Sequence, residues 1–139
     1  MIDILDYDAG NMLSIYRALE FLNIKFKSIY EYQGLSSDLL IIPGVGNFSS
    51  ASSLLEKRGF MSLHKKNPKE RPFIIGICLG MQLLFTDSTE GVLSKGLNLL
   101  KGSVRKIPSQ IGEICLPRTL IGWEQYLIND SNQIKWLSE

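Results

Sequence analysis

The chain lacks the features that mark several large classes of protein. Its 15 basic and 14 acidic residues leave a formal net charge of +1. It therefore has no basic surplus of the kind that binds nucleic acid or an anionic membrane. No apolar run approaches the roughly eighteen residues that a membrane-spanning helix requires. The start, Met1 to Asp6, has no basic lead and contains an aspartate within its apolar stretch, so it predicts a first strand and not a signal peptide.

Cysteine and histidine are also scarce. Cys78 and Cys115 occur in unlike contexts and do not form a metal-ligand spacing. Without an export signal we expect a cytosolic chain whose thiols stay reduced, and we expect Cys115, between two apolar residues, to lie in the core. The single histidine, His64, stands beside two lysines in a predicted solvated loop. We therefore do not expect it to serve as a catalytic base.

What the sequence does contain is an alternation of short apolar runs with helix-like segments. Its 139 residues and 45% apolar content suit one domain, residues 1–139. Predicted strands cover 2–6, 24–30, 39–42 and 73–77, with weaker ones at 103–107 and 124–128, and helices begin near Asn11, Ser49 and Cys78. The unbroken apolar runs at 39–42 and 73–77 are typical of strands covered on both faces. The order predicts an α/β fold with an open, mostly parallel sheet and helices on both faces.

In such sheets the reactive groups gather beyond the carboxyl ends of the strands, and one turn there is especially informative. Residues 76–80 read Gly-Ile-Cys-Leu-Gly at a strand-to-helix junction, which is the thiol counterpart of a nucleophile elbow. Glycines let the backbone pass closely, and the helix N-terminus favours a thiolate at Cys78. The N–H of Leu79 would point at an oxyanion. The alternative, a buried structural cysteine, is disfavoured by the flanking glycines.

A second turn follows the strand at 39–42. Residues 43–48 read Pro-Gly-Val-Gly-Asn-Phe, and a glycine-rich turn can present backbone N–H groups to an anion or an oxyanion. A dinucleotide fingerprint is disfavoured because Ser49 occupies the third glycine position. A plain tight turn is the other alternative. Together with an elbow on a later parallel strand, an oxyanion loop is favoured.

Two polar residues complete the set of candidates. Gln82 falls one helical turn after Cys78 on the same face, where its amide can bind an amino-acid substrate, although glutamine is also a common solvated helix residue. Glu90 closes a polar, acidic segment, residues 86–90. Taken alone, Glu90 is interpreted as surface charge.

Together these motifs resemble a known family. The matching segments are Asp6-Tyr7-x-Ala9-Gly10-Asn11, Pro43-Gly44-Val45-Gly46-Asn47-Phe48, Gly76 to Phe85, Gly96-Leu97-Asn98-Leu99, Lys101-Gly102 and Gly122-Trp123. In this order they resemble the glutaminase subunits of imidazole glycerol phosphate synthase, a branch of the class I glutamine amidotransferases. The resemblance covers essentially the whole chain.

The resemblance implies a reaction and a set of roles. Cys78 would attack the side-chain amide carbon of glutamine, giving a thioester and ammonia, and water would then release glutamate. It assigns the oxyanion hole to the backbone N–H groups of Val45 and Leu79, and glutamine binding to Gly46, Gln82 and Glu90. Ammonia would pass to a (β/α)-barrel cyclase subunit that builds the imidazole ring of histidine. No metal or organic cofactor is implied.

The sequence also departs from the family pattern. Asp8 stands where the family usually has glycine, and residues 117–124 are two residues longer than the family's stretch and lack its histidine. The family continues with two further histidine-containing motifs, and the last of these supplies the triad histidine and glutamate. We therefore expect a C-terminally truncated domain whose sheet exposes an unpaired edge. We expect the 139-residue polypeptide alone to be nearly inactive, because loss of a general base costs on the order of a hundred- to ten-thousand-fold in rate.

The motifs leave two further functions open. One is a glutaminase that serves an amidotransferase for surface polysaccharide, because the motifs describe the release of ammonia and not its destination. The other is a non-catalytic, truncated module that binds a synthase partner.

Overall fold

The structure is a computed structural model that describes residues 1–8, 10–33, 37–67 and 71–115. The chain divides into two compact units, residues 1–106 and 107–139. The predicted strand at 124–128 and the unusual stretch at 117–124 lie outside the described residues. None of the described helices is long and apolar enough to cross a bilayer.

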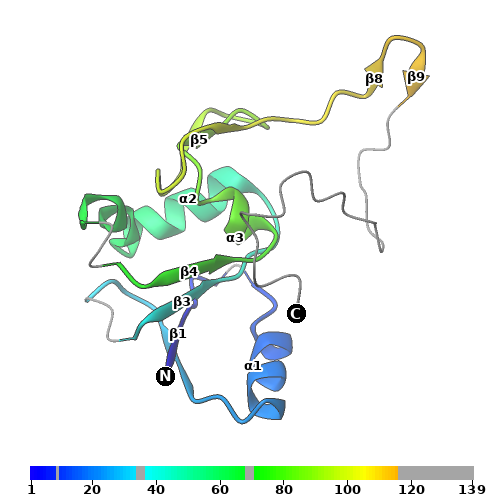
Figure 1. The fold of residues 1–139 in the computed structure, drawn as a ribbon. Helices are drawn as coiled ribbons and strands as arrows, with labels where there is room; N and C mark the ends of the chain where they lie inside the picture. The colour runs from blue at the N-terminus through cyan, green and yellow to red at the C-terminus, as the bar shows by residue number, and fades with distance from the viewer. Residues whose placement is uncertain (9, 34–36, 68–70, 116–139) are drawn as a thin grey trace, which may run out of the picture. The chain divides into compact units, whose positions relative to one another are not determined.

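The first unit is built on a parallel sheet (Figure 1). Its strands are β1 (Ile2–Leu5), β2 (Phe26–Ile29), β3 (Leu39–Ile42) and β4 (Phe73–Gly76). They lie in the order β2-β1-β3-β4, and every neighbouring pair is parallel. The predicted open, parallel sheet is therefore confirmed, with each strand near its expected position. All four carboxyl ends meet at one edge, because the strands run in the same direction.

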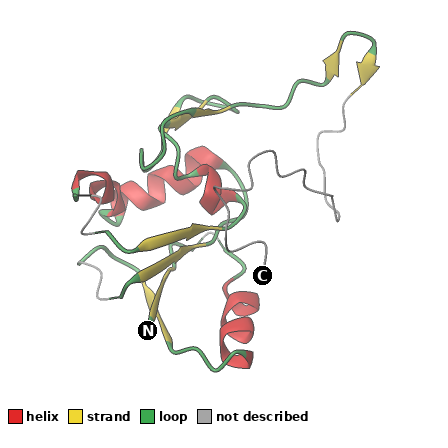
Figure 2. Ribbon diagram, viewed as in Figure 1, coloured by secondary structure: helices red, strands yellow, loops and turns green. Residues whose placement is uncertain are grey.

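Helices cover both faces of this sheet, as predicted (Figure 2). They are α1 (Met12–Phe21), α2 (Phe48–Lys57), α3 (Leu79–Gln82) and a 3₁₀ helix, η1 (Phe60–Lys65). Leu19 of α1 packs with Ile4 and Ile41 on one face. Ile42 and Leu55 belong to the larger core on the other face. Ile41 and Ile42, which are neighbours on β3, thus pack into cores on opposite faces of the sheet, because side chains alternate along a strand.

The helix that follows Cys78 is shorter than predicted. The pattern indicates helix through Phe85, but α3 ends at Gln82. Leu84 N–H donates to Met81 O at 3.2 Å and Phe85 N–H to Gln82 O at 3.1 Å, and these tight i to i−3 bonds turn the chain. A Cβ added to Gly96 would lie 2.1 Å from Phe85 O. The returning chain therefore packs directly on this turn and leaves no room for a longer helix.

The prediction that β4 is buried on both faces is wrong. Phe73 is 82% exposed and Ile75 is 46% exposed, and β4 is an edge strand of the sheet. A continuous apolar run cannot reveal whether a neighbouring element covers it, and α1 packs on β1 and β3 instead. Within the described residues, β4 therefore forms an edge of the sheet that carries exposed apolar side chains.

A small second sheet completes the first unit. It contains β5 (Asp87–Ser88), β6 (Ser94–Lys95) and β7 (Ser103–Val104) in the order β6-β5-β7. The weak prediction of a strand at 103–107 is therefore confirmed for its first two residues. The described part of the second unit is a two-stranded hairpin, β8 (Gln110–Ile111) and β9 (Ile114–Cys115). Cys115 is exposed there, so the prediction that it lies in the core is wrong.

Candidate active site

Cys78 lies in a strained turn between β4 and α3. Its backbone has φ 55° and ψ −116°, and it is the N-cap of α3. A positive φ is costly for a residue with a side chain and is found mainly where the surroundings enforce it. The side chain of Cys78 is exposed, so a ligand in solution can reach the sulfur. The strand, the sharp turn and the helix start are the three parts of a nucleophile elbow.

The flanking glycines are required by close backbone contacts. A Cβ added to Gly76 would lie 2.5 Å from Met81 Cα, and a Cβ added to Gly80 would lie 1.8 Å from Ile42 O. Neither position can therefore carry a side chain without moving main-chain atoms. These contacts give a physical reason for the Gly-x-Cys-x-Gly pattern.

The glycine-rich turn after β3 packs directly against this elbow. Ile77 N–H donates to Ile42 O at 2.9 Å. A Cβ added to Gly44 would lie 3.0 Å from Gly80 N and 3.1 Å from Leu79 Cβ. The two turns are thus joined through their main chains, at the carboxyl ends of the neighbouring strands β3 and β4.

Val45 and Gly46 form the exposed tip of this turn. Val45 is 55% exposed, and Gly46 has φ 102°, a conformation that favours glycine. Directly behind them, the Asn47 side chain accepts hydrogen bonds from Ser49 N at 2.9 Å and Ser50 N at 3.3 Å. This N-cap begins α2 immediately after the turn and fixes where the turn ends.

Tyr7 is a neighbour of the site that the sequence analysis missed. It is 1% exposed, and its hydroxyl donates a hydrogen bond of 2.8 Å to Pro43 O. Burial raises the pKa of the Tyr7 hydroxyl well above its ordinary value, and the nearby Cys78 raises this pKa further. The only signal in the sequence was that Tyr7 belongs to the motif at residues 6–11, just past the end of a strand.

Arg58 holds the loop that carries Tyr7. Its guanidinium donates to Asp6 O at 3.0 Å and Tyr30 O at 3.3 Å, and it forms an ion pair with the Asp8 carboxylate. Asp8 has φ 63°, so it occupies the left-handed conformation in which the resemblance leads us to expect glycine. The ion pair with Arg58 offsets the conformational cost of this positive φ, and a glycine at position 8 could not form it. The Asp6 carboxylate, the largest of several causes, also raises the pKa of the exposed Tyr30 hydroxyl.

The remaining candidates lie at different places. Gln82 is half-buried in α3, and its N–H donates to Cys78 O at 3.3 Å, so it lies one turn beyond Cys78. Glu90 is exposed in the loop after β5, where its N–H donates to Ser88 Oγ at 3.2 Å. Among the described hydrogen bonds, Gln82 has one to Cys78, whereas Glu90 has none to it.

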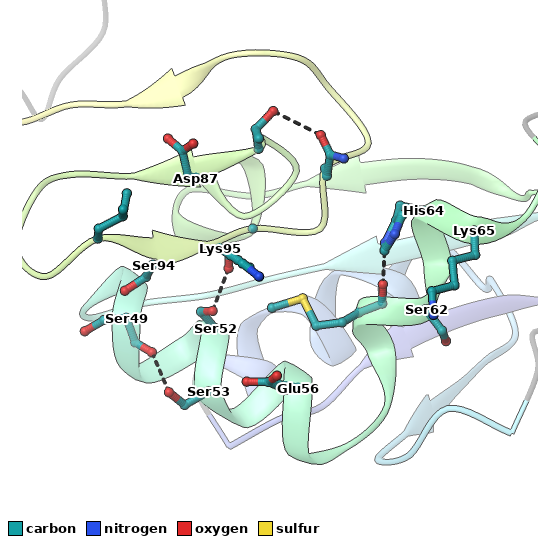
Figure 3. Close-up of a pocket in the computed structure, with 15 residues that line it drawn as sticks. Ser49, Ser52, Ser53, Glu56, Ser62, His64, Lys65, Asp87, Ser94 and Lys95 are labelled. Atoms are coloured by element: carbon teal, nitrogen blue, oxygen red, sulfur yellow. Dashed lines mark hydrogen bonds between the residues drawn. The ribbon is translucent and has the colours of Figure 1, made fainter.

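A cavity of about 1020 Å³ lies apart from these residues, between α2, η1 and the β5–β6 segment (Figure 3). Its lining includes Ser52, Glu56, His64 and Lys95, but not Cys78. His64 is exposed, as expected, although it lies in η1 and not in a loop, and it is hydrogen-bonded to Met61 O. The candidate site is the elbow, because neither Cys78 nor the glycine-rich turn lines the cavity.

Comparison with known proteins identifies the family of the chain. The family model of class I glutamine amidotransferases matches residues 4–124. The chain therefore belongs to the class I glutamine amidotransferase family. A solved structure described as a glutamine amidotransferase shares the fold, with a TM-score of 0.60 and 23% identity over 76% of this chain and 56% of that one.

More similar relatives share one name, imidazole glycerol phosphate synthase subunit HisH. That of Streptococcus sanguinis is 38% identical over 96% of this chain and 64% of its own length. That of Listeria innocua is 39% identical over the same shares. That of Sulfurisphaera tokodaii is 39% identical over 91% of this chain and 60% of its own length. The chain thus spans somewhat less than two thirds of the length of these relatives.

Proposed function

We propose that the chain provides the nucleophile and the oxyanion-binding turn of a glutaminase that acts within imidazole glycerol phosphate synthase. One observation carries this proposal. Cys78 stands exposed in a strained turn at the start of α3, and the main chain of the elbow packs against Gly44 of the neighbouring turn. The names of the relatives favour this synthase over an amidotransferase for surface polysaccharide.

The chemistry begins with the thiolate of Cys78. It attacks the side-chain amide carbon of glutamine, and the carbonyl oxygen takes up the negative charge. The N–H groups of Val45 and Leu79 would stabilise this oxyanion, because fixed donors are worth most where charge develops. The intermediate collapses to a thioester as the amide nitrogen gains a proton and leaves as ammonia. Water then attacks the thioester, releasing glutamate and the thiol.

Three further residues would hold the substrate. Gly46 and Gln82 lie on the two segments that meet at the elbow, and the Gln82 amide can both donate to and accept from the amino-acid part of glutamine. Glu90 carries a carboxylate that suits the substrate ammonium group. Its loop would have to bring it toward Cys78 when glutamine binds.

We also propose that the ammonia passes to a (β/α)-barrel cyclase subunit. The relatives are named as subunits of a synthase, and ammonia released into water would be protonated and lost as a nucleophile. The family match runs across the boundary between the two units, which supports treating residues 1–139 as part of one family domain. The chemistry requires a free thiol, so we propose a reducing compartment, the cytosol.

Selective alkylation of the two cysteines tests this function. Both are free and exposed, so Cys115 is a matched control for the accessibility of Cys78. We expect a chloroketone analogue of glutamine to modify Cys78 at least about tenfold faster than Cys115 at neutral pH, because an elbow thiol is activated. Peptide mass spectrometry would locate the adduct, and excess glutamine should protect Cys78. Equal rates at the two thiols, without protection by glutamine, would refute the proposal.

A further inference from the structure

The buried hydroxyl of Tyr7 lies where three parts of the site meet. Tyr7 follows β1, and its hydroxyl donates to Pro43 O at 2.8 Å. A Cβ added to Gly44 would lie 2.3 Å from the same hydroxyl oxygen. Gly80 N and Leu79 Cβ lie 3.0 Å and 3.1 Å from that same Cβ position. The Tyr7 hydroxyl and the start of α3 thus share the space into which a side chain at position 44 would project.

The bond to Pro43 O controls the orientation of a peptide group. A trans peptide is planar, and its C=O and N–H point in opposite directions. Holding Pro43 O therefore fixes the direction of the Gly44 N–H as well. Gly44 has no side chain to restrict its own rotation, so the turn needs such an external contact to present the next amide, that of Val45, in one direction.

We propose that Tyr7 is a positioning residue for the oxyanion turn, which it holds through the hydrogen bond from its hydroxyl to Pro43 O. This inference rests on the proposed glutaminase function and adds a residue to it. Among the described hydrogen bonds, the Tyr7 hydroxyl makes one to Pro43 O and none to Cys78. It acts through the Pro43–Gly44 peptide, and it contributes by keeping the Val45 amide available to the oxyanion.

The surroundings of Tyr7 suit a permanent donor. Burial and the nearby Cys78 both raise the pKa of the hydroxyl, so the hydroxyl keeps its proton at neutral pH. The donor to Pro43 O is therefore present at the pH of the assay. A second tyrosine offers a matched comparison: the Tyr16 hydroxyl, on α1, is hydrogen-bonded to Ser28 Oγ on the opposite face of the sheet.

The test compares two reagents at Cys78 in a Cys115→Ser background, where only one thiol reacts. The chloroketone analogue of glutamine forms a tetrahedral adduct that needs the oxyanion hole, whereas iodoacetamide reacts by displacement and does not. We expect Tyr7→Phe to lower the ratio of the two rates by about tenfold or more, since loss of a whole oxyanion donor costs about a hundred- to a thousandfold. The iodoacetamide rate itself should stay unchanged. Tyr16→Phe should leave the ratio as in the parent protein.

The outcomes separate the two proposals. If the parent protein shows no preference for the glutamine analogue, the proposed function fails. If the parent shows the preference and folded Tyr7→Phe retains it, the positioning role is overturned and Tyr7 is a core residue only. A ratio that falls equally in Tyr7→Phe and Tyr16→Phe also overturns the role, because it would reflect general loosening of the fold.

Two unnatural residues at position 7 keep the test decisive if Tyr7→Phe does not fold. Para-fluorophenylalanine fills the space of the hydroxyl without a donor, and it should give the low ratio. Para-aminophenylalanine retains an N–H donor at the same place, and it should restore most of the ratio. Equal ratios for these two variants would overturn the proposal.

Discussion

At the scale of single residues, the site depends on where side chains are missing. At three glycines, an added Cβ would lie 3.0 Å or less from a main-chain atom or a hydroxyl oxygen: Gly44, Gly76 and Gly80. The strain at Cys78, with φ 55°, is tolerated because the segments on either side are packed this closely. The same reasoning explains Asp8, whose positive φ is accompanied by an ion pair with Arg58.

The contact at Gly80 leads to a stability prediction. Gly80→Ala would place a Cβ 1.8 Å from Ile42 O, so β3 and the elbow must separate. We expect a loss of about 3 kcal/mol or more in the free energy of unfolding, measured by urea denaturation. Gly91→Ala is the control, because an added Cβ there meets nothing within 4 Å. A Gly80→Ala protein as stable as Gly91→Ala would contradict the packing described here.

At the scale of elements, two helices of equal length begin in different ways. The Asn47 side chain accepts hydrogen bonds from the first turn of α2, whereas the N-cap of α1, Asn11, makes no side-chain cap hydrogen bond. The α2 cap also ends the glycine-rich turn. A defined start of α2 therefore helps to hold Gly46, the residue directly before Asn47, in its left-handed conformation.

This difference predicts unequal effects of one substitution. Asn47→Ala removes the cap and should cost about 1 kcal/mol of stability, whereas Asn11→Ala should cost only a few tenths. Thermal unfolding followed by circular dichroism would measure both. Equal effects would show that the Asn47 cap contributes nothing in solution.

Sequence patterns predicted these elements unequally well, for physical reasons. The apolar runs at β1 and β3 and the helix-like segments at α1 and α2 are local properties of the sequence, and the structure confirms them. The length of α3, the exposure of Phe73 and the burial of Tyr7 depend on which distant segment packs there. A single sequence does not contain that information in its spacing. The turn that carries Cys78 was predictable because close backbone contacts require glycines, which are visible in the sequence.

At the scale of the whole molecule, β4 presents an exposed apolar face at the edge of the sheet. Phe73 and Ile75 point to the same side of an edge strand, because side chains alternate along a strand, and they are 82% and 46% exposed. Exposed apolar surface beside unpaired strand edges promotes association between chains. We therefore expect apolar segments of other chains to associate with this edge of the sheet.

A substitution on this face should separate association from stability. We expect Phe73→Ser to reduce self-association of the 139-residue polypeptide in sedimentation velocity. Its effect on stability should be within about 0.5 kcal/mol, because exposed positions contribute little. By contrast Leu40→Ala, at a fully buried position of β3, should cost about 2–5 kcal/mol. Unchanged association of Phe73→Ser would mean that β4 is not the contact surface.

The direct contact between the turn after β3 and the elbow has a consequence for how such a centre can change over evolutionary time. Its geometry is set by carbonyl groups and α-carbons, while the side chains of Val45 and Ile77 project outward. Substitutions at those two positions can accumulate without displacing the sulfur or the amides. Evolution can therefore change the side chains at positions 45 and 77 to fit a new partner, while the main-chain contacts between the turn and the elbow stay the same.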